Sequence, residues 1–579
     1  MKVKKNIGQG EVHGEVFCFG GGRYTINQSS RQAPKWLSSV MLSDIIGMTC
    51  RHALAFDDHT RKELRKDSKT LAKALLALGV KKGDFLVILD NFYPCICAVY
   101  AAMRIGAVAV PFAEDASREI LAKFIMEQKG DTFVITNNQT PDYASKLCKK
   151  TAYKCKCVIS INEKRYKEKP IELGKEYYDY REMPVVAKMG HRRLRIPWST
   201  GETIMLGSSS GTSGEMKFFP YTDRNIVSSV LSTQIAVGVS LFKHSSDVWA
   251  GVVPRRYPYG LLNSALLPSW GRRSVKLVGP DDTVDDLFSE ADVICCATDF
   301  TEIVQKELTI SGYSLTKNGK EKPITIIIGG AYLTPEKSDE FLNFLQKRGF
   351  NAKIRPGYGI SEAAGCVSVV PESNYRPGTV GRLVPGVKVW LRKDDGSAYK
   401  LGEQGRLWVS GANVVQTYNT EMANQKNICR DDDGEVWVDT GDYVSLHQNG
   451  YLEFHCSEKE FYITNDAREK VYTKKAEEAI EQMDGVSRCW VLGEPKRSAS
   501  VAFIAPEKGV DGEILKQKII QNIAKSTTAS GEFLREIEIP RYYKIVSGDD
   551  LQINKAGKRL KVVKDRLMNL VDFDKPDFR

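Results

Sequence analysis

A short segment rich in glycine and hydroxyl groups, Leu206–Lys217, constrains the fold of this chain more than any other feature. It holds three glycines and five serine or threonine residues, ends in a lysine, and comes just after the apolar run 204–206. Glycines let a backbone turn tightly, so that successive N–H groups can point at one anion. The hydroxyl groups add donors without bulk, and Lys217 supplies a mobile positive charge for phosphate. Because the Gly-Lys-Ser/Thr ending of a P-loop is absent, a P-loop NTPase is disfavoured. The segment is predicted to bind phosphate, with a flexible Ser/Gly linker as the alternative.

The chain up to about residue 379 alternates helix and strand patterns. Periodicity predicts helix 68–78, which stops at Gly79, and buried strands 85–89, 132–136 and 324–328. The last of these strands runs directly into Gly329-Gly330. Parallel α/β sheets bind ligands at such junctions, at the carboxyl ends of their strands.

The texture of the sequence changes after Thr379. Shorter strands are predicted at 387–391 and 406–409, and a small α+β portion follows after about Ser457, with helix 474–482 and strand 542–546. A chain of 579 residues exceeds what one hydrophobic core usually holds, so two or more domains are expected.

Composition excludes several classes of protein. The largely apolar stretch 93–113 contains Arg104, Gly106 and Pro111, so it is predicted to be a buried helix ending near Gly106 and a strand at 107–110, and we expect no membrane span. The net charge of +11 is spread along the chain, so we expect no nucleic-acid partner. Thirteen cysteines without a C-x-x-C pair, and seven scattered histidines, argue against a zinc site and fit a reducing compartment. No apolar segment follows the basic start, so no signal peptide is predicted and a cytoplasmic location is expected.

Five short motifs in a fixed order carry a family resemblance: Ser209–Lys217, Gly329–Ala331, Gly357–Glu362, Asp439–Asp442 and Asn554–Lys558. Together they resemble the signatures of the adenylate-forming (AMP-binding) superfamily, which includes acyl-CoA synthetases, luciferases and peptide-synthetase adenylation domains. Met216 and Phe218 replace a proline and a glycine of the family's phosphate-binding signature. The resemblance runs from about residue 42 to near the C-terminus.

The resemblance implies an α/β fold. A large N-terminal domain of parallel α/β subdomains plus a β-rich subdomain, residues 1–456, would bind ATP and the acid. A small mobile α+β C-terminal domain, residues 457–579, would carry Lys558.

The resemblance also implies roles for individual residues around ATP and Mg²⁺. Ser361 would contact the α-phosphate, Glu362 would hold Mg²⁺ together with Thr212, and Lys558 would reach the α-phosphate and the acid during adenylation. Asp442 would accept both ribose hydroxyls. The remaining nucleotide contacts would come from Ser209, Ser210, Gly211, Thr212, Ser213, Gly214, Lys217, Gly330, Ala331, Tyr358 and Gly359. Taken one at a time, such residues could equally belong to ordinary turns or to a solvated basic surface.

By the same resemblance, the acid pocket would be lined by Tyr257, Tyr259, Gly329, Ala363 and Gly365. Small side chains at 363–365 leave room for an aromatic ring or an acyl chain, and the sequence favours neither. Relatives that activate amino acids carry an aspartate where this chain has Leu261–Ser264, so an ordinary α-amino acid is disfavoured.

The predicted function is an ATP-dependent carboxylic acid ligase that forms an acyl-adenylate, releases pyrophosphate and passes the acyl group to a thiol, coenzyme A. One alternative is a stand-alone adenylation enzyme that loads the phosphopantetheine of an acyl or peptidyl carrier protein. Another is a nucleotide-binding pseudoenzyme with a scaffolding role, against which intact Glu362, Asp442 and Lys558 argue.

The hinge motif of the family is altered. Where the family carries Asp-Arg-x-Lys, this chain has Cys456–Lys459, and Ser457 cannot supply a guanidinium. The glycine-rich turn that normally follows is replaced by Asn465–Lys470, within which Arg468 is a candidate substitute for the missing arginine. The adenylation half of the site is therefore predicted to be complete and the thioester half altered.

Overall fold

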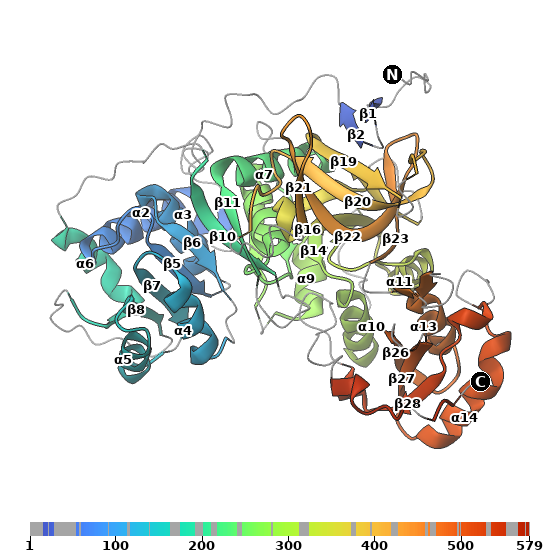
Figure 1. The fold of residues 1–579 in the computed structure, drawn as a ribbon. Helices are drawn as coiled ribbons and strands as arrows, with labels where there is room; N and C mark the ends of the chain where they lie inside the picture. The colour runs from blue at the N-terminus through green and yellow to red at the C-terminus, as the bar shows by residue number, and fades with distance from the viewer. Residues whose placement is uncertain are drawn as a thin grey trace.

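The computed structural model describes most of the chain as a mixed α/β protein (Figure 1). The described residues are 15–20, 23–27, 54–56, 59–90, 92–112, 116–137, 139–162, 174–190, 201–209, 217–239, 246–279, 282–311, 323–371, 378–393, 397–418, 427–457, 461–463, 470–494, 497, 499–527, 534–551, 566–573 and 575–577. Within these ranges, none of the helices has both the length and the apolar character that crossing a bilayer requires.

The first sheet has seven strands in the order β11-β10-β6-β5-β7-β8-β9. All neighbours pair in parallel except the β10–β11 hairpin. The strands are β5 (Phe85–Leu89), β6 (Val108–Pro111), β7 (Thr132–Asn137), β8 (Cys155–Ile161), β9 (Tyr177–Asp179), β10 (Thr203–Ser209) and β11 (Lys217–Thr222).

Helices cover both faces of this sheet, which explains why its strands are continuously apolar. In β5, Leu86 and Ile88 pack on α2 and α3, whereas Val87 and Leu89 point to the opposite face, against α4 and α5. The helices are α2 (Arg61–Ala77), α3 (Tyr93–Ile105), α4 (Arg118–Glu127), α5 (Pro141–Lys150) and α6 (Met183–Met189).

The second sheet has sixteen strands and combines a parallel with an antiparallel part. The parallel part contains β3 (Leu54–Phe56), β12 (Val248–Gly251), β13 (Ser274–Leu277), β14 (Val293–Cys296), β15 (Ile324–Ile328) and β16 (Ala352–Ile360), with β4 (His59–Thr60) at its edge. The antiparallel part contains β1 (Glu15–Gly20), β2 (Arg23–Asn27), β17 (Gly365–Val369), β18 (Thr379–Leu383), β19 (Val387–Arg392), β20 (Gln404–Gly411), β21 (Ile428–Arg430), β22 (Val436–Leu446) and β23 (Tyr451–Ser457).

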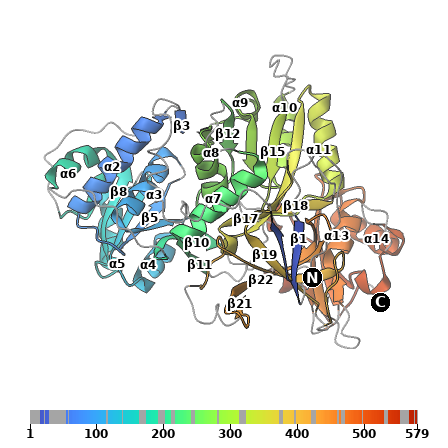
Figure 2. The same cartoon turned by 90° about the horizontal axis from the view of Figure 1, so that it is seen from above.

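Helices also pack on this second sheet (Figure 2). They are α7 (Asp223–Val237), the π-helix η4 (Tyr259–Leu266), α8 (Leu267–Trp270), α9 (Val284–Glu290), α10 (Phe300–Ser311) and α11 (Pro335–Lys347). A core of α9, α10 and α11 residues lies against alternate side chains of β14 and β15.

Strand β16 belongs to both parts of the second sheet. Its first half pairs in parallel with β15 as far as Pro356, and from Gly357 onward it pairs antiparallel with β17. Proline has no N–H to give to a ladder, so it suits the point where one partner replaces another. The strand thereby carries residues 357–360 to the place where the parallel and β-rich parts meet.

The C-terminal portion has its own three-stranded sheet, with β26 (Val486–Glu494) antiparallel and β28 (Tyr542–Ile545) parallel to β27 (Ala499–Pro506). Helices α13 (Thr473–Glu481) and α14 (Gly512–Asn522) pack on it, and a small hairpin, β24 (Phe461–Ile463) with β25 (Lys470–Tyr472), precedes it. Among the described residues, no strand pairing joins this sheet to the other two. An exposed ion pair, Arg488 to Glu302 at 3.4 Å, joins β26 to α10.

Most predicted elements are confirmed within one or two residues. Strands 85–89 and 324–328 have the predicted bounds, and the helix predicted within 93–113 ends at Ile105, with Gly106 in the left-handed conformation (φ 77°). The prediction for helix 68–78 was too short at its start. The helix begins at Arg61, because Thr60 and Glu63 form a capping box that the apolar pattern does not reveal.

Candidate active site

The turn between β16 and β17 carries Ser361 and Glu362, and its backbone is unusual. Ala364 has φ 49° and Gly365 has φ 112°, conformations that side chains with a Cβ rarely adopt. Such strain persists where the surroundings fix it. Here each of four successive carbonyl oxygens, from residue 361 to residue 364, accepts a hydrogen bond from another segment. The donors are the Tyr221 hydroxyl (2.6 Å), the Val415 N–H (2.8 Å), the Asn413 amide (3.1 Å) and the Ser229 hydroxyl (2.7 Å), in that order.

The first of these donors ties the turn to the hairpin that carries the phosphate-binding segment. Tyr221 lies on β11, is fully buried, and a Cβ on Gly207 of β10 would overlap its ring. Burial, with a smaller contribution from the Glu362 charge, raises the pKa of Tyr221 well above its usual value, so its hydroxyl stays protonated and donates. The β10–β11 hairpin is thereby joined to the Ser361–Glu362 turn.

A second phenol contacts the Glu362 carboxylate directly. The Tyr418 hydroxyl donates to Oε1 of Glu362 at 3.1 Å, and the Tyr418 ring packs on Phe219 of β11 with ring centroids 5.5 Å apart. Burial first, and then Glu362, raise the pKa of Tyr418 well above its usual value. Only one carboxylate oxygen of Glu362 is engaged by this bond.

Asp442 is presented by a bulge in β22. Between the register pairs Arg406–Tyr443 and Trp408–Asp439, β22 spans four residues where β20 spans two. Gly441 has φ 72°, and the Asp442 N–H donates a hydrogen bond to the Thr440 hydroxyl oxygen at 3.0 Å. A bidentate ion pair fixes the other end of the bulge, because Arg406 bonds both oxygens of Asp439, the closest contact being 2.7 Å.

The bulge brings Asp442 against Tyr358 of β16. The Tyr358 hydroxyl donates to Oδ2 of Asp442 at 2.6 Å. Burial, followed by the Asp442 charge, raises the pKa of Tyr358 well above its usual value, so the phenol remains a donor. Phe454 of β23 lies 6.2 Å from the Tyr358 ring and stacks on Tyr332 at 5.4 Å, measured between ring centroids. Residues far apart in the sequence therefore form one aromatic and acidic group.

A cavity lies next to these residues. At one end it is bordered by glycines and polar residues from the carboxyl ends of β15 and β16, and it continues between the sheet and α7, η4 and α8. Its lining includes Thr233, Val237, Trp249, Val253, Tyr257, Tyr259, Asn263, Leu267, Cys295, Ile327, Gly329, Gly330, Gly357, Tyr358, Gly359, Ser361, Gly365 and Cys366. The cavity therefore connects predicted nucleotide residues to predicted acid-pocket residues.

Tyr259 shapes the wall of this cavity. Its hydroxyl donates to the Ile327 carbonyl at 2.8 Å, and its ring lies 3.5 Å from where a Cβ on Gly329 would stand. One turn further along η4, the Asn263 amide fills the space beside Gly365 that a Cβ would need. The glycines at the end of β15 and the start of β17 are therefore places where a side chain approaches the backbone closely.

The structure brings together most of the predicted residues that it describes. Tyr257, Tyr259, Gly329 and Gly365 line the cavity with Gly330, Tyr358, Gly359 and Ser361, while Glu362 and Asp442 lie beside it. Ala363, which was predicted to line the acid pocket, does not border the cavity. It is fully buried and its carbonyl accepts a hydrogen bond from the Asn413 amide, so it supports the turn. Ala331 is exposed next to Gly330 and does not line the cavity either.

Several predicted residues cannot be placed. Residues 210–216, which include Ser210, Gly211, Thr212, Ser213 and Gly214, lie outside the described residues, as do Lys558 and Arg468. Ser209 and Lys217 are placed as the last register pair of the β10–β11 hairpin, with only their backbones described. The predicted phosphate-binding segment thus connects β10 to β11.

The sequence did not reveal Tyr221, Tyr418, Trp249 or Asn263 as site residues. Tyr221 could have been suspected, because it follows the phosphate-binding segment by a few residues on an apolar strand. Asn263 could have been suspected too, because it lies within Leu261–Ser264, where relatives that activate amino acids carry an aspartate. For Tyr418 and Trp249 no local signal exists, since only the packing of distant segments brings them to the site.

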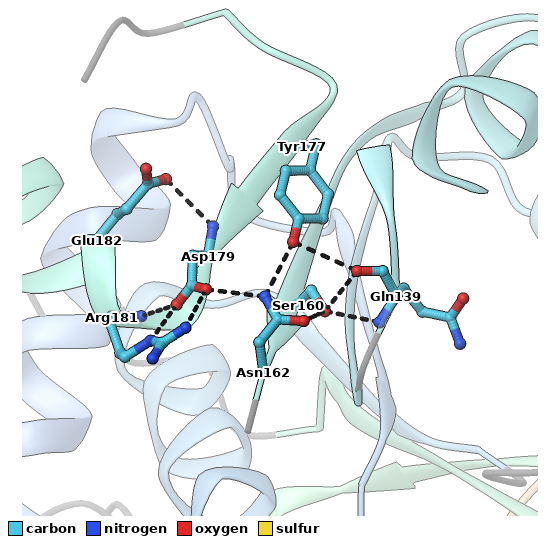
Figure 3. A network of polar contacts seen from close by, with 7 residues as sticks. All are labelled: Gln139, Ser160, Asn162, Tyr177, Asp179, Arg181 and Glu182. Atoms are coloured by element: carbon cyan, nitrogen blue, oxygen red, sulfur yellow. Dashed lines mark hydrogen bonds and ion pairs between the residues drawn. The ribbon is translucent and has the colours of Figure 1, made fainter. Parts of the chain in front are cut away.

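A second polar network lies at the carboxyl ends of β7, β8 and β9 (Figure 3). Asn162 donates to Tyr177 (2.9 Å) and Asp179 (2.8 Å), and Asp179 pairs with Arg181 at 2.7 Å. Ser160 donates to the Asn162 side chain at 2.9 Å and accepts from the Gln139 N–H at 2.8 Å. Because these side chains hydrogen-bond to one another, we interpret the network as one that stabilises this end of the sheet and not as a second candidate site.

Comparison with known sequences defines the class. The sequence model of the AMP-binding enzyme family matches residues 48–419. The chain belongs to the AMP-binding enzyme family, and the predicted resemblance is confirmed.

Two curated relatives illustrate the breadth of the match. Acyl-CoA ligase AFT1-1 of Alternaria alternata is 28% identical over 240 residues, which cover 41% of this chain and only 40% of that relative. Acyl-CoA synthetase 7 of Caenorhabditis elegans is 24% identical over 495 residues, covering 82% of this chain and 86% of the relative.

Solved structures confirm the fold class. ATP-bound MatB from Rhodopseudomonas palustris superimposes with a TM-score of 0.72 at 22% identity, covering 91% of this chain and 98% of that one. O-succinylbenzoate coenzyme A synthetase (MenE) from Bacillus subtilis, in complex with ATP and magnesium ion, gives 0.68 at 21% identity, with the same coverage of 91% and 98%.

Proposed function

We propose that this protein is an ATP-dependent carboxylic acid ligase that forms an acyl-adenylate and then transfers the acyl group to coenzyme A. The observation that carries the proposal is the meeting of Tyr358, Asp442 and the Ser361–Glu362 turn at one end of a cavity. Family membership and the names of the relatives, which are acyl-CoA ligases and synthetases, support it.

The reaction asks the protein mainly to position groups and to stabilise charge. An oxygen of the acid attacks the α-phosphorus of ATP, pyrophosphate leaves, and the product is an acyl-AMP. A thiol then attacks the acyl carbon, AMP leaves, and a thioester forms. In such transfers most of the acceleration comes from orientation and from fixed donors aimed at developing charge.

Each described residue has a proposed part in the first step. Asp442 accepts the ribose hydroxyls with the carboxylate that Tyr358 orients, and the Tyr358 ring lies against the adenine. The Ser361 hydroxyl contacts the α-phosphate from a turn whose carbonyls are all held by other segments. Lys217, Lys558 and the hydroxyls of residues 209–213 complete the proposed phosphate contacts.

The donor set fits Mg²⁺. Glu362 offers a carboxylate, a hard oxygen ligand of the kind that Mg²⁺ prefers, and Tyr418 engages only one of its oxygens. Glu362 would hold the ion together with Thr212. Bound there, Mg²⁺ would neutralise phosphate charge.

The proposal is tested by acid-dependent exchange of labelled pyrophosphate into ATP across a panel of acids, followed by transfer assays with coenzyme A and with holo carrier proteins. We expect exchange with at least one acid and thioester formation with coenzyme A. Transfer to carrier proteins alone would favour a stand-alone adenylation enzyme. No exchange with any acid, together with retained ATP binding, would favour the pseudoenzyme.

Asp442→Ala is the matching variant for nucleotide binding. It removes a charged acceptor of two ribose hydroxyls, and a hydrogen bond to a charged group contributes roughly 1.5–3 kcal/mol. ATP affinity, measured by calorimetry, should fall tenfold or more. An unchanged affinity would show that Asp442 does not bind the ribose.

A further inference from the structure

We propose that the acid is a monocarboxylate whose body is uncharged and mainly apolar, and that Trp249 limits how long that body can be. This inference rests on the proposed function and specifies its substrate class.

The composition of the cavity wall is the first observation. Beyond the glycines and Ser361 at the nucleotide end, the described wall is formed mainly by aliphatic and aromatic side chains. Its polar groups are those of Thr233, Asn263 and two cysteines, the tyrosine hydroxyls and the Trp249 indole N–H. The described wall includes no aspartate, glutamate, lysine, arginine or histidine. Most of its side chains beyond the nucleotide end are buried; Trp249, for example, is 4% exposed, whereas Tyr257, Tyr259 and Cys366 are half-buried.

This wall discriminates strongly between acids. Burying a second carboxylate or an ammonium without a partner is far costlier than burying a methylene, so dicarboxylates and amino acids are rejected. Each methylene moved from water into such a wall, by contrast, favours binding by roughly fourfold. The acid's own carboxylate stays at the glycine-rich end, beside Ser361.

Cationic side chains lie behind the wall. Arg255 is 2% exposed and donates to the carbonyls of Gly251 (3.1 Å) and Val253 (3.4 Å), and Arg256 donates to the hydroxyl of the lining Tyr257 at 3.2 Å.

Arg355 of β16 is 7% exposed, and its guanidinium bonds the carbonyls of Val370 (2.9 Å) and Val237 (3.3 Å). These bonds hold the guanidinium to main-chain carbonyls, one of them that of the lining residue Val237, and Arg355 itself is not among the lining residues. A preference for dicarboxylates would mean that one of these three arginines pairs with the second carboxylate, and would overturn the proposal.

The register of the parallel strands gives the depth of the cavity. Trp249 of β12 is level with Val293 of β14, and Val293 is level with Thr325 of β15. Thr325 precedes Gly329 by four residues, which corresponds to about 13 Å along the strands at about 3.3 Å per residue. Trp249 therefore borders the cavity well below the glycine-rich end. Val237 at the end of α7 and Leu267 at the start of α8 also line the cavity.

The wild-type protein tests the substrate class. Pyrophosphate exchange is measured with straight-chain monocarboxylates of increasing length, with benzoate and cinnamate, with dicarboxylates of matched length, and with α-amino acids. We expect kcat/KM to rise severalfold per methylene up to a limit and to be at least a hundredfold lower for charged-body acids. Exchange that favours dicarboxylates or amino acids would overturn this inference and leave the proposed function standing. No exchange with any acid would overturn both.

Two variants with opposite predictions test the role of Trp249. Trp249→Leu should move the length optimum toward longer acids, and Val237→Phe should move it toward shorter ones, each changing the ratio of long to short by on the order of tenfold. Trp437→Phe is the matched control, because Trp437 is a buried tryptophan (1% exposed) outside the cavity lining, so its ratio should not move. An unchanged ratio in Val237→Phe, or equal shifts in Trp249→Leu and the control, would overturn the assignment. Val237→Phe keeps the test decisive even if Trp249→Leu fails to fold.

Discussion

Two buried phenols, Tyr221 and Tyr418, hold the residues with which this protein is proposed to handle phosphate and metal. One donates to the Ser361 carbonyl and the other to the Glu362 carboxylate. Neither touches a reacting atom, so both are positioning residues. Their rings come from the β10–β11 hairpin and from the segment after β20, so two other parts of the chain fix the position of the turn.

Tyr221→Phe is predicted to separate this positioning role from simple stability. Among the described residues, the substitution leaves the half-buried Ser361 carbonyl with only its bond from the Ala364 N–H, so we expect a loss of about 1–3 kcal/mol in the free energy of unfolding. Pyrophosphate exchange should fall at least tenfold at saturating ATP, because Ser361 and Glu362 lose their alignment.

Tyr100→Phe is the matched control for that variant. Tyr100 is also fully buried, and its hydroxyl accepts from the Trp270 indole at 2.8 Å, away from the turn. It should lose comparable stability and keep its exchange rate. If the two variants lose exchange equally, Tyr221 has no positioning role.

At the scale of elements, the change of partner along β16 creates the site. Gly359 lies where β16 pairs with β17, and a Cβ there would overlap the Gly365 carbonyl oxygen. Gly357, two residues earlier on the same strand, has room, because its nearest neighbour would be the Ser368 carbonyl at 3.4 Å. The two glycines offer a matched comparison within one strand.

Gly359→Ala is predicted to destabilise the protein by roughly 1–3 kcal/mol, since the β16–β17 backbones must separate to admit a methyl group. Gly357→Ala should cost clearly less. Thermal unfolding midpoints of the two variants, measured side by side, check this. Equal midpoints would show that the close approach of the strands is not needed for stability.

The pairing of β22 with β23 bears on the altered hinge motif. The Cα of Ser457 pairs with that of Asp442, the proposed ribose ligand. The side chain of an arginine in place of Ser457 would therefore extend from a position next to the proposed nucleotide site. This supports the interpretation that the arginine contact implied by the family's hinge motif is missing here.

Ser457→Arg is predicted to tighten ATP binding by on the order of 1 kcal/mol, as expected for one partly exposed charged contact. Ser457→Gln, similar in reach but neutral, should not tighten it, and Arg468→Ala should be nearly silent. Calorimetric ATP affinities check all three. A large loss of exchange in Arg468→Ala would mean that this arginine has replaced the missing one.

At the scale of the whole molecule, the C-terminal sheet forms its own hydrophobic core beside α10 and α11 (Figure 1). The ion pair between Arg488 and Glu302 is exposed, and such pairs contribute little, typically about 0–1 kcal/mol. The boundary near residue 457 and the motion of this portion remain predictions.

Lys558→Ala is predicted to abolish pyrophosphate exchange while leaving ATP affinity within about threefold, because its charge is proposed to act on the transition state and not on the bound substrate. Lys564→Ala, in the same basic stretch, is the control and should retain exchange. Near-normal exchange in Lys558→Ala would remove this lysine from the mechanism.

Much of this protein follows from its sequence alone. The strands 85–89 and 324–328 were predictable because continuous apolar runs can be buried only on both faces of a sheet, and the helix ending at Gly106 because glycine readily takes the left-handed conformation. The five motifs predicted the family, since their order along the chain is itself information. These features are local, and local chemistry determines them.

The tertiary structure alone decided what surrounds those motifs. The sequence could not place the Tyr221 hydroxyl on the Ser361 carbonyl or the Tyr358 hydroxyl on Asp442, because these partners stand 140 and 84 residues apart. Nor could it place Trp249 deep in the cavity, because the lining residues come from segments spread between Thr233 and Val369. Such contacts depend on strand register and on bulges like that at Gly441, where one residue more or less sends a side chain to the other face. The spacing of residues along the chain does not reveal which face a side chain takes, because the packing of distant segments determines it.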